Sequence, residues 1–135
     1  MHRCAGLIIA LLPVVAACAR APATATPPGG GAQLYLQNCV PCHRDDGRGV
    51  PGIYPSLAGS ATVNDDPLAL ARWVLNGERP ASLPAGRYPT RMPPFGWLKD
   101  PDAALLLSHV RSNFGNRAPA VDEATIARAR AGESR

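Results

Sequence analysis

The sequence predicts a small all-α domain of three to four short helices joined by long loops. Two segments carry start and stop signals for a helix around an apolar face, from Asp66 to Gly77 and from Asp100 to Gly115. No alternating apolar and polar pattern of useful length predicts a strand. Fifteen prolines and thirteen glycines among 135 residues favour loops between the helices.

The first helix is expected from about Ala32 to Asn38. For the second, Asp66 is the expected N-cap, Pro67 takes the first helical position and Gly77 follows the last turn. Its apolar side chains predict one buried face, with Trp73 beside it: Leu68, Leu70, Ala71, Val74 and Leu75.

The third helix has the same start and stop signals, with Asp100 as the expected N-cap, Pro101 next and Gly115 after the end. A short fourth helix is expected from Asp122 to about Ala131. Between the second and third helices, the segment from Gly77 to Pro94 is a long loop, of a kind that is usually functional in a compact domain.

The N-terminal segment is typical of an export signal. Arg3 supplies a positive start, and the apolar run Leu7–Ala17 is too short to span a bilayer. The run ends in Val15-Ala16-Ala17-Cys18, which resembles a bacterial lipoprotein box, in which the cysteine becomes the lipidated first residue. The alternative is ordinary signal cleavage after Ala19 or Ala21, since small residues at the required spacing precede both positions.

Both interpretations leave only Cys39 and Cys42 in the mature domain, because Cys4 leaves with the leader and Cys18 is acylated or removed. No structural disulfide is expected. The predicted organisation is a signal peptide at 1–17, a lipidated cysteine and flexible linker at 18–31, one domain at 32–121, and a C-terminal helix and tail at 122–135.

The motif Cys39-Val40-Pro41-Cys42-His43 indicates the chemistry of the chain. On one helical turn this spacing places both thiols and the imidazole on a single face. Covalent attachment of haem needs two sulfurs for the vinyl groups and an imidazole for the iron on the same side. A thioredoxin-like pair would need a βαβ pattern, which is not visible. Structural zinc would need a fourth ligand, which only His109 offers.

Met92 is the candidate for the second axial position. It is the only methionine outside the leader, and it stands in Arg91-Met92-Pro93-Pro94-Phe95-Gly96. The two prolines disfavour helix and hold Met92 on an extended loop, where its thioether can point at the iron. The alternative is an apolar packing role, which is the usual role of a lone methionine.

From Gly31 to about Val121 the chain resembles class I cytochromes c, and most closely the cytochrome c domains of membrane-associated quinoprotein and flavoprotein dehydrogenases. The resemblance rests on several motifs: Gly31-x3-Tyr35-x3-Cys39-x2-Cys42-His43, Gly49–Gly52, Tyr54–Gly59, Met92–Gly96 and Ser112–Asn116. It implies one covalent haem c per chain, with His43 as the proximal iron ligand and Met92 as the distal one. It also implies that the carbonyl of Pro55 orients the proximal imidazole.

His109 departs from the family pattern, which usually has an aromatic residue there. The expected role of His109 is packing against the first helix, beside a stripe formed by Leu105, Leu106, Val110 and Phe114. The alternative is that His109 binds the iron in place of Met92. Other residues are expected at the haem: Trp73, Trp97, Tyr54 and Tyr88 as wall or core, and Arg72, Arg79, Arg87 and Arg91 as candidate partners of the propionates.

The expected function is one-electron transfer, because two filled axial positions leave no open site on the iron. The alternative is a peroxidase-like or gas-binding protein in which Met92 does not bind. Expected partners are a dehydrogenase, of which the chain is alternatively the haem subunit, an oxidase or another cytochrome. The chain is expected to be lipid-anchored through Cys18 on the periplasmic side of a bacterial membrane, the outer membrane slightly favoured by Ala19. The alternative is a soluble periplasmic protein. Scattered arginines without a basic run argue against nucleic acid.

Overall fold

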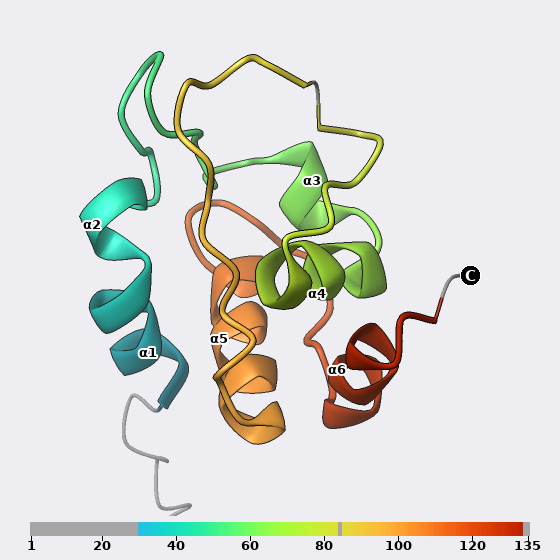
Figure 1. The fold of residues 1–135 in the computed structure, drawn as a ribbon. Helices are drawn as coiled ribbons and strands as arrows, with labels where there is room; N and C mark the ends of the chain where they lie inside the picture. Colours follow the sequence, from blue (N-terminus) through green and yellow to red (C-terminus); the bar gives the residue numbers. More distant parts are fainter. Residues whose placement is uncertain (1–29, 84, 134–135) are drawn as a thin grey trace, which may run out of the picture.

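The computed structural model describes residues 30–83 and 85–133, and these residues form six helices. They are α1 (Gly30–Asn38), α2 (Val40–His43), α3 (Ala61–Asn64), α4 (Pro67–Asn76), α5 (Asp100–Ser112) and α6 (Glu123–Arg130), shown in Figure 1. The described residues contain no strand, only one isolated bridge between Val50 and Tyr54. The predicted all-α fold is confirmed. The predicted leader, Cys18 and most of the linker lie outside the described residues.

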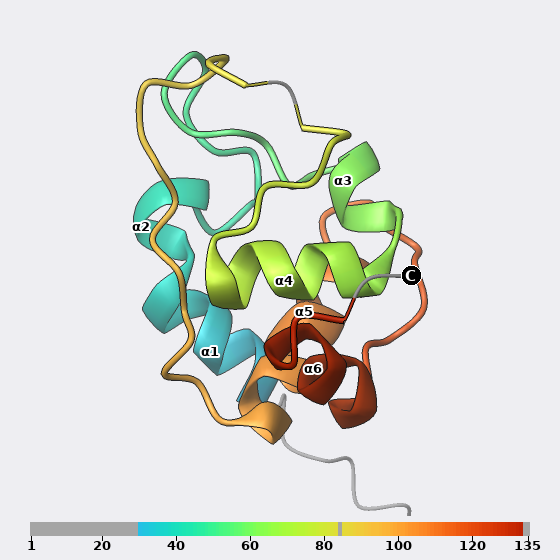
Figure 2. The same cartoon turned by 45° about the vertical axis from the view of Figure 1, so that its right-hand side comes forward.

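Helix α5 is central to the packing. Helix α1 packs along one side of it, and α6 packs against both α5 and α4. Figures 1 and 2 show the segment between α4 and α5 passing over α4 and then descending between α2 and α4 to the start of α5. The largest fully buried side chains come from α1, α3, α4, α5 and α6: Tyr35, Val63, Leu75, Leu106 and Ile126. In the described part of the chain, no helix is long and apolar enough to cross a bilayer.

Helix α4 has the predicted ends. The Asp66 side chain accepts a hydrogen bond from the backbone N–H of Leu68 at 3.0 Å, which satisfies one of the unpaired donors of the first turn. Gly77 closes the helix in the left-handed region with a φ of 75°, which glycine adopts without a Cβ penalty. The five apolar residues predicted to share one face are all buried.

Helix α5 differs from the prediction at its start. It begins at Asp100 with Lys99 as the N-cap, so Asp100 is not the cap. The Asp100 carboxylate accepts a hydrogen bond from Arg130 Nε on α6 at 2.6 Å instead. The helix ends at Ser112, and the expected stop residue Gly115 follows with a φ of 79°.

Helix α6 has the predicted extent, with the Asp122 side chain capping the N–H of Thr125 at 2.8 Å. Ile126 and Ala129 of this helix are fully buried. The C-terminal helix is therefore part of the same core as residues 32–121. The sequence interpretation also missed the single-turn helix α3, and it placed the start of α1 at Ala32 rather than Gly30.

A first prediction concerns Gly31, where α1 meets α5. A Cβ at Gly31 would lie 2.4 Å from the carbonyl oxygen of Leu105 and 3.0 Å from Cβ of His109. We expect Gly31→Ala to lower the free energy of unfolding by about 1–3 kcal/mol, because the α5 backbone has to shift. Equilibrium urea unfolding of the haem-loaded protein measures this.

The matched control is Gly30→Ala, one residue earlier in the same helix. A Cβ at Gly30 would meet only Cδ1 of the Leu105 side chain, at 3.1 Å. A side-chain terminus moves easily, so we expect a small change. Equal losses of stability in the two variants would contradict the close approach of the two backbones.

Candidate functional site

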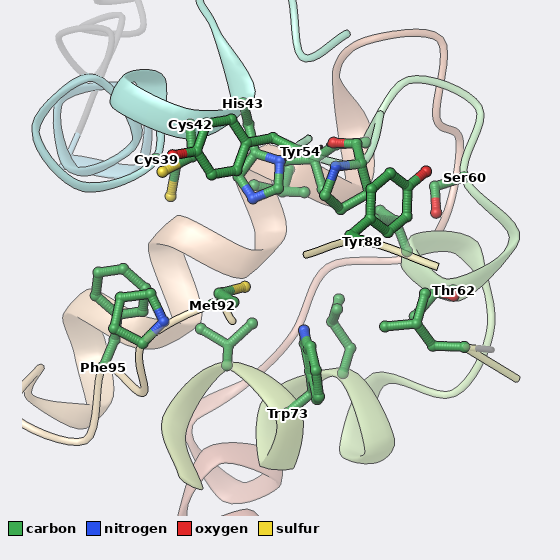
Figure 3. Close-up of a pocket in the computed structure, with 18 of the residues that line it drawn as sticks. Cys39, Cys42, His43, Tyr54, Ser60, Thr62, Trp73, Tyr88, Met92 and Phe95 are labelled. Carbon is green, nitrogen blue, oxygen red and sulfur yellow. Dashed lines mark hydrogen bonds between the residues drawn. The ribbon is translucent and has the colours of Figure 1, made fainter. Parts of the chain in front are cut away.

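A largely apolar cavity lies between α2, α4 and α5, and the long loop before α5 closes part of it. Its walls are formed by apolar side chains from α3, α4, α5 and the loop before α3. These side chains are Leu57, Val63, Leu70, Val74, Leu106, Leu107 and Val110. Figure 3 shows Cys39, Cys42 and His43 along one side of this cavity, with Met92 and Trp73 across from them.

The junction of α1 and α2 positions the two cysteines. The N–H of His43 donates to the Cys39 carbonyl at 2.8 Å, so Cys39, Cys42 and His43 lie on one continuous turn. Both cysteines are free thiols that line the cavity, and Cys39 is buried. Burial raises the pKa of Cys39 to about 12, and the neighbouring Cys42 adds to this rise. Without a group attached to its sulfur, Cys39 is therefore a neutral thiol at physiological pH.

The imidazole of His43 is buried and held by one hydrogen bond. Its Nδ1 lies 2.9 Å from the Pro55 carbonyl oxygen, which can only accept, so Nδ1 carries the proton. Burial lowers the pKa of His43, although this hydrogen bond opposes the shift. The ring is therefore neutral, with the unprotonated Nε2 left for the cavity.

Gly49 makes this contact between His43 and Pro55 possible. Its N–H donates to the His43 carbonyl at 2.9 Å, and its φ is 66°. A Cβ at Gly49 would lie 2.5 Å from the carbonyl oxygens of Tyr54 and Pro55. Only glycine allows the two segments to approach this closely.

Met92 is half-buried in a segment without regular structure and lines the cavity opposite His43. Two anchors fix this segment. The Thr90 hydroxyl donates to the Ile53 carbonyl at 2.8 Å, and the Phe95 N–H donates to the Val74 carbonyl on α4 at 2.8 Å. The prolines restrict Met92 locally, and these two contacts place it against the cavity. The anchors were not part of the sequence prediction.

The end of the cavity away from the thiols is more polar. Ser60, Thr62 and Tyr88 lie there (Figure 3). Of the four candidate arginines, Arg79 and Arg91 line the cavity. The other two do not. Arg72 is bound to Glu78, with Nε 2.8 Å from Oε2, and the Arg87 guanidinium lies 5.9 Å from the ring centre of Tyr88.

The aromatic prediction is correct for three residues and wrong for the fourth. Tyr54, Trp73 and Tyr88 line the cavity. Trp97 is on the surface with 67% of its area exposed, and its ring centre lies 6.3 Å from that of Phe95. Phe95 takes the position at the cavity wall, and the turn that follows directs Trp97 outward.

His109 packs against the first helix, as predicted. Its ring centre lies 5.6 Å from that of Tyr35 on α1 and 5.8 Å from that of Phe114. His109 is not among the residues that line the cavity. Leu105, expected in the stripe beside it, is half exposed.

Among residues 30–83 and 85–133, no three His, Cys, Asp or Glu side chains converge as ligands for a metal ion. With His109 directed at Tyr35, the fourth ligand of the zinc interpretation is not supplied. The cavity instead combines apolar walls with two thiols, one imidazole and one thioether, a donor set suited to a covalently held haem iron.

The sequence model of the family Cytochrome c matches residues 30–114. The chain belongs to the cytochrome c family. Membership of this family implies covalently bound haem c as the cofactor and electron transfer as the role of the domain. The cavity fits that group, because its apolar walls suit the macrocycle and both thiols lie on one side of it. Hydroxyls lie toward the other end (Figure 3), and Arg79 and Arg91 are among the lining residues, so polar partners for propionates are present.

Several relatives of this cytochrome are named as subunits of dehydrogenases. It is 38% identical over 91 residues to the cytochrome c subunit of an alcohol dehydrogenase (quinone) from Gluconobacter oxydans, covering 66% of this chain and 19% of that protein. It is 33% identical over 121 residues to the fructose dehydrogenase cytochrome subunit from Gluconobacter japonicus, covering 84% and 24%. The alignments thus span about a fifth to a quarter of these relatives.

A shorter relative is also found. Cytochrome c-552 from Thermus thermophilus is 29% identical over 93 residues, which cover 64% of this chain and 69% of that protein.

Proposed function

We propose that this cytochrome is exported and carries single electrons from a dehydrogenase, or another donor, to a terminal oxidase or a second cytochrome. The observation that carries the proposal is the arrangement of Cys39, Cys42 and His43 on one side of an apolar cavity that Met92 faces from the other. Support for the donor class comes from relatives named as cytochrome c subunits of dehydrogenases acting on alcohols, gluconate and fructose.

The proposed site assigns a separate role to each residue. Cys39 and Cys42 form the two thioethers, His43 is the proximal ligand through Nε2, and Met92 is the distal ligand. The Pro55 carbonyl, 2.9 Å from Nδ1, fixes the plane and the tautomer of the imidazole and makes it a better donor to the iron. Arg79 and Arg91 are the proposed partners of the propionates, because they line the cavity and Arg72 and Arg87 do not.

This arrangement favours electron transfer over catalysis. Haem c supplies a one-electron iron couple when it is bound. His43 and Met92 would both hold the haem iron, which would leave no coordination site for a substrate, and the thioether would favour the ferrous state. Burial of His43 and the apolar walls keep water from the site.

Carbon monoxide binding to the reduced protein at neutral pH tests this proposal. We expect no spectral change, because Met92 fills the distal position. A spectrum that shifts on addition of carbon monoxide would mean an open site, and would favour a peroxidase-like or gas-binding function instead.

We further propose that the cytochrome is anchored on the periplasmic side of a bacterial membrane by lipid on Cys18, with the outer membrane slightly favoured. The support is the sequence Val15-Ala16-Ala17-Cys18, which precedes a linker rich in proline and glycine. A lipid chain at this position would hold the domain near the surface without a spanning helix.

Mass spectrometry of the native N-terminus tests the anchor. We expect an acylated Cys18, and loss of membrane partitioning in Cys18→Ser because the acylated thiol is gone. Haem attachment is the internal control and should be unchanged, since Cys39 lies well beyond the linker. An unmodified start at Arg20 or Pro22 would rule the anchor out.

A further inference from the structure

Arg111 is a buried cation in the last turn of α5. Only 2% of its surface is exposed. Its Nε donates to the Pro119 carbonyl at 2.9 Å, and its Nη1 donates to the carbonyls of Val63 at 2.7 Å and Asp65 at 3.0 Å. All three acceptors are backbone oxygens, and none of the ion pairs found in the described residues involves Arg111. The guanidinium is thus hydrogen-bonded, and no carboxylate among the described residues forms an ion pair with it.

The charge of Arg111 lies directly behind the wall of the haem cavity. Val63, whose carbonyl the guanidinium contacts, lines the cavity, and so does Val110, the neighbour of Arg111 on α5. Val63 is itself buried, so little water lies between the guanidinium and the cavity. An interaction across such a wall is weakly screened.

The charge is also permanent. Burial lowers the pKa of Arg111, while the negative charges of Asp66 and Asp65 raise it. A guanidinium stays protonated throughout the physiological range. Arg111 therefore acts on whatever occupies the cavity as a fixed positive charge, with no proton gained or lost.

We propose that Arg111 raises the reduction potential of the haem by placing a fixed positive charge behind Val63. Reduction adds one electron, delivered by a redox partner, and lowers the charge at the iron by one. A nearby cation therefore repels the oxidised state more than the reduced state. This inference rests on the proposed function, because it needs the haem in this cavity.

The experiment measures the midpoint potential of the haem-loaded protein in Arg111→Gln and Arg111→Lys. We expect Arg111→Gln to lower the midpoint potential, because it removes the positive charge. We expect Arg111→Lys to lower it much less, because lysine keeps the charge and loses only the planar guanidinium donors. The matched control is Arg117→Gln, which removes the same charge from an exposed side chain nearby. We expect a smaller shift there, and one that vanishes at high salt.

An unchanged potential in Arg111→Gln, or equal shifts in the glutamine and lysine variants, would overturn the proposal.

If the glutamine variant does not accumulate, Asp66→Asn decides: asparagine keeps the cap of α4 but removes a charge that opposes Arg111. The potential should rise more than in Asp122→Asn, which makes the same change at the cap of α6. Equal shifts there would overturn it too. Failure of the proposed function would be seen separately, as a wild-type protein without bound haem.

Discussion

Met92→Ala is expected to abolish the weak sulfur-to-iron charge-transfer band of the oxidised protein and to lower the reduction potential. The thioether is the ligand that stabilises ferrous iron, and axial ligands set haem potentials over roughly 0.8 V. We expect the loss to be an appreciable part of that range. A redox titration with visible spectra measures both effects, and the reduced variant should also bind carbon monoxide.

Met92→Leu is the matched control. Leucine fills nearly the same volume in the cavity but offers no sulfur, so it separates ligation from packing. Both variants should lose the charge-transfer band and have a lower reduction potential. Only the alanine variant should also be less stable because of the cavity that the smaller side chain leaves. If neither variant changes the band or the potential, Met92 is not the ligand. His109 is then the remaining candidate, although it packs against Tyr35.

The chain without attached haem is expected to be largely unfolded. The cavity separates α2 from α4 and α5, and its apolar lining has no partner unless the cofactor fills the space. A domain of this size buries too little apolar surface to tolerate such a loss without a cross-link or cofactor. Far-UV circular dichroism during heating should show low helix content and no cooperative transition.

The haem-loaded protein is the control and should melt cooperatively. Protein produced without haem attachment that shows native-like helix content and a cooperative melt would refute this prediction. The result would mean that α1, α4, α5 and α6 form a sufficient core among themselves.

Local signals predicted the fold well wherever the sequence carries them. The capped start and left-handed end of α4 follow from Asp66, Pro67 and Gly77, which act on neighbouring backbone groups. The same reasoning failed at Asp100, because Arg130 lies thirty positions along the chain and competes for its carboxylate. No local pattern reports such a contact.

In the candidate site too, the sequence predicts local features and misses those that depend on long-range contacts. The spacing of Cys39, Cys42 and His43 is local, so the sequence predicts that they share one face. The hydrogen bond between the Pro55 carbonyl and His43 was available only through the resemblance to a family. The close approach of Gly49 to Pro55 was not predicted. The outward direction of Trp97 and the burial of Arg111 depend on tertiary packing, which composition and periodicity do not encode.

The central claim is that one haem is bound covalently through Cys39 and Cys42. Trypsin cleaves after Arg44, so a single peptide ending there carries both cysteines and His43. Mass spectrometry of that peptide, after denaturation and extraction with acidified acetone, tests the claim most directly. We predict a peptide heavier by one haem, with neither thiol open to alkylation. A peptide of unmodified mass, with two thiols that alkylate, would contradict the claim.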